Sequence, residues 1–185
     1  RVLVDAPCSG LGTLRRSPDL KWRQTPQTVQ EMVQKQAAIL KSAARLLKPG
    51  GRLVYATCSV LEAENEAVAA AFTAAQPQFE PLNAAQMLEA LKVPQAATLC
   101  SQQEGACAGV PAGQYLRLWP DLHGTDGFFG AAGKKQAEGP HNDPSRTLHT
   151  VAARSRVRNG RLSSVAWLAL VTKQALTNQG NVRMA

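Results

Sequence analysis

The sequence predicts an α/β domain built on a mostly parallel sheet, with an antiparallel strand pair towards its C-terminal part. A strand, a long helix and a second strand follow one another within residues 1–57, and such a crossover joins parallel neighbours in one sheet. Two apolar runs at 114–118 and 127–131, joined by a short connection, are typical of an antiparallel pair. The 185 residues suffice for one domain with a buried core.

The first three elements have clear boundaries. Residues 1–5 form a short apolar strand, followed by a loop rich in Gly, Ser, Pro and Arg. Thr25 and Pro26 are a typical N-cap and first helical residue, and apolar residues then recur at helical spacing. The Lys-Pro-Gly-Gly sequence at 48–51 ends this helix, and residues 52–57 form the second strand.

Weaker patterns cover the rest of the chain. They predict a helix over 61–75, a strand over 78–82, a helix over 84–91, an irregular stretch over 92–112 and a helix over 163–176.

Charge divides the chain into two parts. The whole sequence carries +8, but residues 134–185 hold nine basic and two acidic residues and so carry +7 of it. We therefore predict a folded domain over 1–135 and a basic tail over 136–185, which is either a nucleic-acid-binding arm or a solvated, poorly ordered end.

No apolar run approaches the ~20 residues of a membrane span, and no signal peptide is evident, so we expect a cytoplasmic protein with no membrane partner. Because Arg1 already belongs to a strand, we also expect a fragment that begins inside a fold.

Two of the four cysteines stand in matching positions. Cys8 follows the first strand and Cys58 ends the second, and each is followed by serine. The carboxyl ends of parallel strands meet at one edge of a sheet, where ligands bind, so the two thiols are expected to share one crevice. The alternative is that both are small buried apolar residues. No CxxC pair is present, which argues against a zinc or dithiol redox site, and we expect reduced thiols and no metal.

Several short motifs, taken in order, resemble the RsmB/NOP2/Sun family of RNA cytosine-5 methyltransferases over residues 1–135. They are Asp5-Ala6-Pro7-Cys8-Ser9-Gly10, Arg15-Arg16-Ser17-Pro18-Asp19-Leu20-Lys21-Trp22, Leu47-Lys48-Pro49-Gly50-Gly51, Ala56-Thr57-Cys58-Ser59-Val60, Glu64-Asn65-Glu66 and Asp126-Gly127-Phe128-Phe129. The resemblance implies a class I (Rossmann-like) methyltransferase fold that uses S-adenosylmethionine and acts on RNA, with rRNA favoured over tRNA.

The resemblance also implies site residues. Cys58 would be the nucleophile that adds to cytosine C6, and Cys8 would assist product release. Asp5 would lie where the cofactor meets the target base, and its carboxylate could accept a hydrogen bond from the cytosine amino group. A lowered pKa of Cys58 would favour its thiolate, with Arg16 and Lys21 as candidate causes. Trp22, Phe128 and Phe129 could stack on RNA bases, although core packing is favoured for the two phenylalanines because they lie in a predicted strand.

The upstream parts of the family's fold, including its Gly-rich cofactor loop, have no counterpart in this sequence. We therefore expect weak S-adenosylmethionine binding by this chain alone, and an exposed apolar edge at residues 1–5 that favours aggregation. Two other functions stay open. One is a non-catalytic RNA-binding remnant of such an enzyme, and the other is a cysteine hydrolase, for which His123 is the best-placed histidine.

Overall fold

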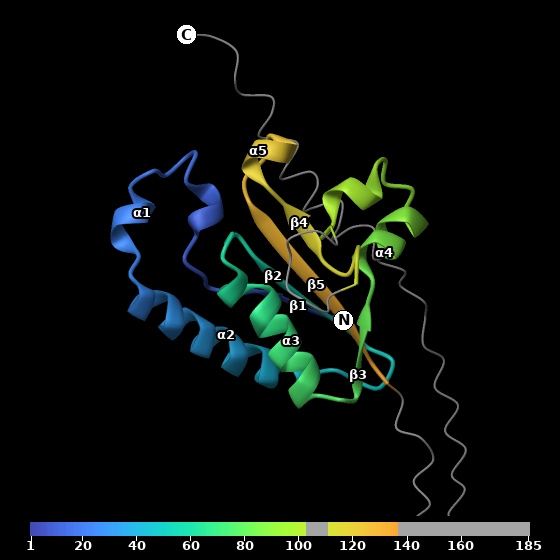
Figure 1. Ribbon diagram of the computed structural model, residues 1–185. Coiled ribbons are helices and arrows are strands. Elements are labelled where there is room, and N and C mark those ends of the chain that lie inside the picture. The colour runs from blue at the N-terminus through green and yellow to red at the C-terminus, as the bar shows by residue number, and fades with distance from the viewer. Residues whose placement is uncertain (103–110, 137–185) are drawn as a thin grey trace, which may run out of the picture. The chain divides into compact units, whose positions relative to one another are not determined.

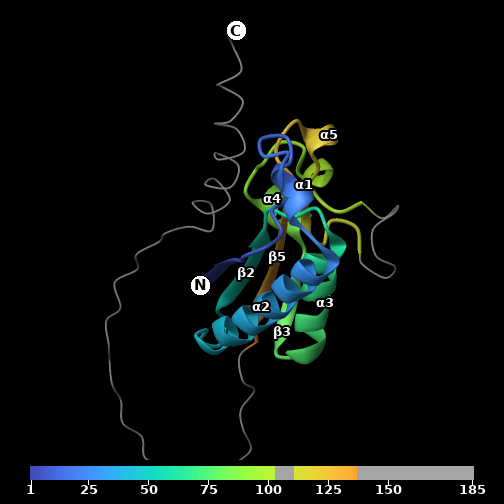
Figure 2. The same cartoon turned by 90° about the vertical axis from the view of Figure 1, so that its left-hand side faces the viewer.

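The computed structural model describes residues 1–102 and 111–136, in which a five-stranded sheet is covered on one face by two helices (Figures 1 and 2). The strands are β1 (Val2–Asp5), β2 (Arg52–Thr57), β3 (Phe79–Leu82), β4 (Leu116–Leu118) and β5 (Phe128–Lys135). The covering helices are α2 (Pro26–Arg45) and α3 (Glu66–Ala75). The predicted α/β class is confirmed.

The sheet has the order β1–β2–β5–β3, and β4 pairs with the part of β5 that β3 leaves uncovered. The pair β1–β2 is parallel as predicted, with Val2 opposite Leu53 and Asp5 opposite Ala56. The expected predominance of parallel strands is corrected: among the described strands β2, β3 and β4 all pair with β5 in antiparallel fashion, so the sheet is mixed. The reason is that β5 inserts between β2 and β3 and runs against both.

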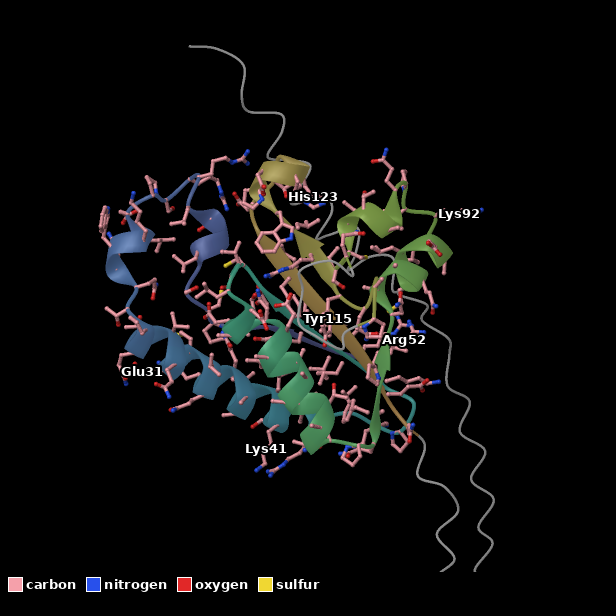
Figure 3. The ribbon with its side chains drawn as sticks, viewed as in Figure 1. Glu31, Lys41, Arg52, Lys92, Tyr115 and His123 are labelled. Carbon is pink, nitrogen blue, oxygen red and sulfur yellow. The ribbon has the colours of Figure 1, made fainter. Side chains whose placement is uncertain are left out.

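Helix α2 begins where the sequence predicts. The Thr25 hydroxyl accepts a hydrogen bond from the Thr28 backbone N–H at 3.2 Å, the Thr28 hydroxyl accepts one from the Thr25 N–H, and Pro26 takes the first turn. The helix buries its apolar side against the sheet, while Glu31 and Lys41 point away from it (Figure 3). It ends at Arg45, shortly before the predicted Pro-Gly-Gly stop.

The predicted helix over 61–75 is broken into two. A single turn of 3₁₀ helix, η2 (Glu62–Glu64), is followed by α3, and the break falls at Asn65, which has φ −115° and ψ −94°. The side chain of Asn65 explains the break because it is used elsewhere. Its Oδ1 accepts a hydrogen bond from the Thr57 hydroxyl at 2.5 Å and its Nδ2 donates one to the Ser59 carbonyl at 2.9 Å.

The remaining short elements connect these parts. They are η1 (Leu11–Thr13), α1 (Leu20–Arg23), α4 (Ala84–Ala90), η3 (Ala96–Leu99) and α5 (Pro120–His123). The predicted helix over 163–176, and all but the first residue of the predicted tail over 136–185, lie outside the described residues. No helix in the described part of the chain is both long and apolar enough to pass through a membrane.

The core lies between the sheet and its two helices, and Phe129 is its centre. Its fully buried ring packs edge-on against Tyr55, with ring centroids 6.1 Å apart, and at a tilt against Tyr115 at 5.1 Å. At one edge of the sheet, β1 pairs only with β2 among the described strands. Leu3 on this edge is partly exposed beside Ile39 and Leu46 of the neighbouring helical segment, which confirms the predicted apolar edge.

Candidate active site

Two thiols face each other at the carboxyl ends of the parallel strands. Cys58 directly follows Thr57, the last residue of β2, and Cys8 lies in the loop that follows β1. Their Sγ atoms are 3.4 Å apart, and both side chains are only partly buried. The prediction that the two thiols lie close together at one edge of the sheet is therefore confirmed.

A backbone junction of three segments holds the two thiol loops together. The Gly12 N–H donates to the Cys58 carbonyl at 2.9 Å, and the Gly127 N–H donates to the Gly12 carbonyl at 2.8 Å. Both glycines are needed for this close approach. A Cβ at Gly12 would lie 2.6 Å from the Cys58 carbonyl oxygen, and one at Gly127 would lie 2.5 Å from a methyl group of Val60. Residues more than 100 positions apart thus meet at the mouth of the site.

A buried carboxylate ties the same loops together below the thiols. Glu64 is fully buried, and its Oε1 accepts hydrogen bonds from the Ser9 backbone N–H at 2.8 Å and from the Gln36 side chain at 3.2 Å. Its Oε2 accepts from the Ser9 and Ser59 hydroxyls, each at 2.5 Å. We call these four residues the Glu64 network. Ser9 follows Cys8 and Ser59 follows Cys58. Through these two serines, the two loops that carry the thiols are hydrogen-bonded to one carboxylate.

Sequence reasoning missed the role of Glu64. The signal available was the serine after each cysteine, which marks two polar side chains at equivalent strand ends that need a common buried partner. The sequence by itself marks Glu64 only as part of the Glu64-Asn65-Glu66 motif.

The pKa values of the two thiols shift in opposite directions because the thiols are so close. A hydrogen bond from the Cys8 thiol lowers the pKa of Cys58 to about 7, although burial and the negative charges of Asp5 and Glu64 act in the other direction. The pKa of Cys8 is raised, because its thiol donates that hydrogen bond, is partly buried, and faces the Cys58 thiolate. Above about pH 7 the pair therefore holds a thiolate on Cys58 and a thiol on Cys8.

The cause of the lowered Cys58 pKa differs from the one expected from sequence. Arg16 forms an ion pair with Asp126, which lies beside the junction. Lys21 places its ammonium over the ring of Trp22, 4.8 Å from the centroid. Neither cation contributes to the shift, which comes first from the Cys8 thiol. The pKa of Cys58 is thus lowered by its neighbouring thiol.

The other candidate residues take different positions. Asp5 ends β1 with an exposed side chain, close enough to Cys58 to raise the pKa of that thiol by charge repulsion. His123 uses Nδ1 to accept from the Trp119 N–H at 2.9 Å, and its Nε2 lies 2.9 Å from the Thr98 carbonyl. It therefore joins α5 to η3. Within residues 1–102 and 111–136 no contact pairs it with a thiol, as a cysteine hydrolase would require.

Solved structures have a similar fold. The chain superimposes on the crystal structure of PH0851 with a TM-score of 0.56 and 37% identity, covering 72% of this chain and 26% of that one. It matches a methyltransferase homologue from Pyrococcus horikoshii with a TM-score of 0.52 and 30% identity, covering 72% and 38%. Fold and neighbours define the chain as part of a class I methyltransferase domain.

Sequence comparison then identifies the family. The chain belongs to the family of 16S rRNA methyltransferases RsmB/F, whose family model matches residues 1–134. It is 41% identical over 137 residues to the probable ribosomal RNA small subunit methyltransferase B of Synechocystis sp., covering 73% of this chain and 27% of that protein. It is 51% identical over 80 residues to the corresponding methyltransferase B of Klebsiella pneumoniae, covering 43% and 19%.

The chain spans about a quarter of the length of the curated relatives it matches. The family consists of S-adenosylmethionine-dependent methyltransferases. The chemistry of one residue near the thiols is compatible with this cofactor: Asp5 has an exposed carboxylate close to Cys58, and a carboxylate would stabilise a positively charged sulfonium.

Proposed function

We propose that this chain forms the target-base part of an RNA (cytosine-5) methyltransferase that acts on rRNA in the cytoplasm. Cys58 is the nucleophile and Cys8 assists product release. The observation that carries the proposal is the pair of Sγ atoms 3.4 Å apart at one mouth, with the pKa of Cys58 lowered to about 7. The names of the relatives favour rRNA over tRNA as the substrate.

A thiolate at this position solves a specific chemical problem. C5 of cytosine is a weak nucleophile, but addition of the Cys58 thiolate at C6 makes C5 enamine-like and able to accept a methyl group. S-adenosylmethionine supplies that methyl group as an electrophile when it is bound. Asp5 holds the target base by accepting a hydrogen bond from its amino group, which uracil lacks.

The second thiol acts after methyl transfer. The pKa of Cys8 is raised first by its hydrogen bond to Cys58, and also by repulsion from the Cys58 thiolate. Once the Cys58 sulfur is bonded to C6 it carries no charge, so both effects weaken and Cys8 can lose its proton to solvent. The Cys8 thiolate then removes the C5 proton, the C5–C6 double bond re-forms, and the C6–S bond breaks to release Cys58 as a thiolate.

The nucleophile can be tested without the methyl donor. Reversible addition of a thiolate at C6 allows C5 to exchange its hydrogen with water, so RNA with tritium at cytidine C5 should release tritium when mixed with this chain. Cys58→Ala should abolish the release and Cys100→Ala should not, because Cys100 is buried and its pKa is raised to about 11 by burial. Release that is unchanged in Cys58→Ala would refute the proposal.

The role of Cys8 requires turnover. A chimera in which this chain replaces the matching segment of the Klebsiella pneumoniae relative provides it. With S-adenosylmethionine and RNA, Cys8→Ser in this chimera should accumulate a covalent RNA adduct that resists denaturation, and Cys8→Ser with Cys58→Ala should form none. RNA binding without tritium release and without an adduct would instead support a non-catalytic RNA-binding protein.

A further inference from the structure

The three aromatic side chains considered for RNA stacking differ in their exposure in the structure. Phe129 is fully buried between Tyr55 and Tyr115, and Phe128 is half-buried in the same strand. Trp22 is 80% exposed on α1, which makes it the most exposed of the large apolar side chains in the described part of the chain. Only Trp22 therefore presents its ring to a partner.

The segment that carries Trp22 is anchored beside the thiols. The Gln24 side chain donates to the Ser9 carbonyl at 3.0 Å, which closes the loop that follows Cys8. On its far side the loop is held by the ion pair of Arg16 with Asp126 and by a hydrogen bond from Arg15 to the Gly124 carbonyl at 3.1 Å. Trp22 thus lies in the chain between two anchor points, Arg15 and Arg16 on one side and Gln24 on the other.

Positive charge is concentrated in the segment that carries this ring. Residues 15–23 contain four basic residues and one acidic residue, whereas residues 1–133 as a whole are nearly neutral. The side chains of Arg15 and Arg16 are more than half exposed, and the Lys21 ammonium lies 4.8 Å from the Trp22 ring centroid. An exposed aromatic ring among cations next to a nucleotide-modifying site has the chemistry of a single-stranded RNA contact.

We propose that residues 15–23, the Trp22 platform, bind the single-stranded RNA that flanks the target nucleotide. Trp22 stacks on one unpaired base, and Lys21 and Arg15 contact phosphates. An A-form duplex keeps its base faces stacked, so the platform selects unpaired RNA. This inference rests on the proposed function, since it assigns the flanking part of the same substrate.

The test uses the full 185-residue chain and a labelled single-stranded RNA oligonucleotide, with the same sequence as a duplex for comparison. Trp22→Ala should weaken single-strand binding about tenfold, and Trp22→Phe should keep it within about threefold, because a smaller ring still stacks. Leu122→Ala is the matched control, because Leu122 is 73% exposed on α5, and it should change nothing.

Salt dependence separates stacking from charge. Lys21→Ala should lower the slope of log affinity against log salt by about 0.7, while Lys41→Ala and Trp22→Ala should leave it unchanged. Lys41 is suitable because it points away from the sheet on α2 (Figure 3). Equal affinities of Trp22→Ala and Leu122→Ala, or a duplex bound as tightly as the single strand, would overturn the inference.

The two proposals fail separately. Tritium release at saturating RNA reports on Cys58, and single-strand affinity reports on Trp22. If tritium release by the wild type depends on Cys58 but Trp22→Ala binds single-stranded RNA normally, the Trp22 platform is refuted and the role of Cys58 is supported. Loss of affinity in Trp22→Ala without any tritium release from the wild type would support the platform and refute the chemistry.

Discussion

Replacing Glu64 with alanine should both destabilise the domain and release the two thiol loops. The carboxylate accepts four hydrogen bonds from Ser9, Gln36 and Ser59 at a fully buried position. After Glu64→Ala the hydroxyls of Ser9 and Ser59, already 3.2 Å apart, can bond to each other, and the Gln36 amide keeps the Pro7 carbonyl at 2.9 Å. The Ser9 backbone N–H has no such replacement.

The magnitude follows from that difference. An unsatisfied buried N–H costs about 2 kcal/mol, and the cavity with its weakened hydroxyl bonds adds a further ~1–2 kcal/mol. We expect Glu64→Ala to lower the free energy of unfolding by about 3–4 kcal/mol, a large share of the ~5–15 kcal/mol typical of a domain. Glu64→Gln keeps an oxygen for the Ser9 N–H and should cost about 1–2 kcal/mol.

Urea unfolding followed by circular dichroism measures the effect. Glu31→Ala is the matched control because it removes the same atoms from an exposed position on α2, where the side chain only accepts a hydrogen bond from Gln27 at 3.3 Å (Figure 3). Equal unfolding free energies for Glu64→Ala and Glu31→Ala would refute the reasoning.

A second measurement tests the charge of Glu64. This charge raises the pKa of Cys58, so Glu64→Gln should lower that pKa below about 7. The readout is the pH dependence of iodoacetamide alkylation at Cys58, followed by peptide mass spectrometry. A Cys58 pKa that rises in Glu64→Gln would contradict this expectation. It would show that Glu64 affects the thiol by holding it in place and not by its charge.

Three further changes test other parts of the structure. Cys8→Ala removes the hydrogen bond that lowers the pKa of Cys58, so the alkylation midpoint should rise from about 7 towards the ordinary ~8.5; an unchanged midpoint would exclude Cys8 as the cause. Gly12→Ala places a Cβ 2.6 Å from the Cys58 carbonyl oxygen and should lower the free energy of unfolding in urea by about 2 kcal/mol. Gly130→Ala is the control and should lower it less, because its nearest contact would be at 3.4 Å. A larger loss in Gly130→Ala than in Gly12→Ala would contradict the role of Gly12 in the junction. Leu46→Lys should reduce self-association in sedimentation velocity, because Leu46 is exposed beside the open edge of β1; equal association would place the contact elsewhere.

Local patterns were sufficient to predict most elements. The strand over 52–57 is an apolar run between a Gly-Gly stop and Cys58, and its predicted bounds match β2. The start of α2 followed from the Thr25-Pro26 cap. The meeting of Cys8 and Cys58 also followed from sequence, because parallel strands determine which of their ends share an edge.

Features that depend on distant partners were not predictable in this way. Nothing local in residues 127–135 specifies that β5 inserts between β2 and β3, because pairing is decided by the whole sheet. Glu64 lies in a charged stretch that is typical of a solvated surface, and its burial depends on donors up to 55 residues away. The activation of Cys58 was assigned to cations because the Sγ–Sγ distance of 3.4 Å, which lets one thiol act on the other, is a tertiary quantity.

The central place of β5 affects how the protein matures during synthesis. Because β5 is the last of the described strands in chain order, a nascent chain leaving the ribosome keeps one hydrogen-bonding edge of β2 open until residues beyond Gly127 emerge. Until then the Gly12 loop also lacks the hydrogen bond that the Gly127 N–H donates to the Gly12 carbonyl. Phe129 lies on the same strand, so the fully buried ring at the centre of the core is also among the last of the described residues to be synthesised.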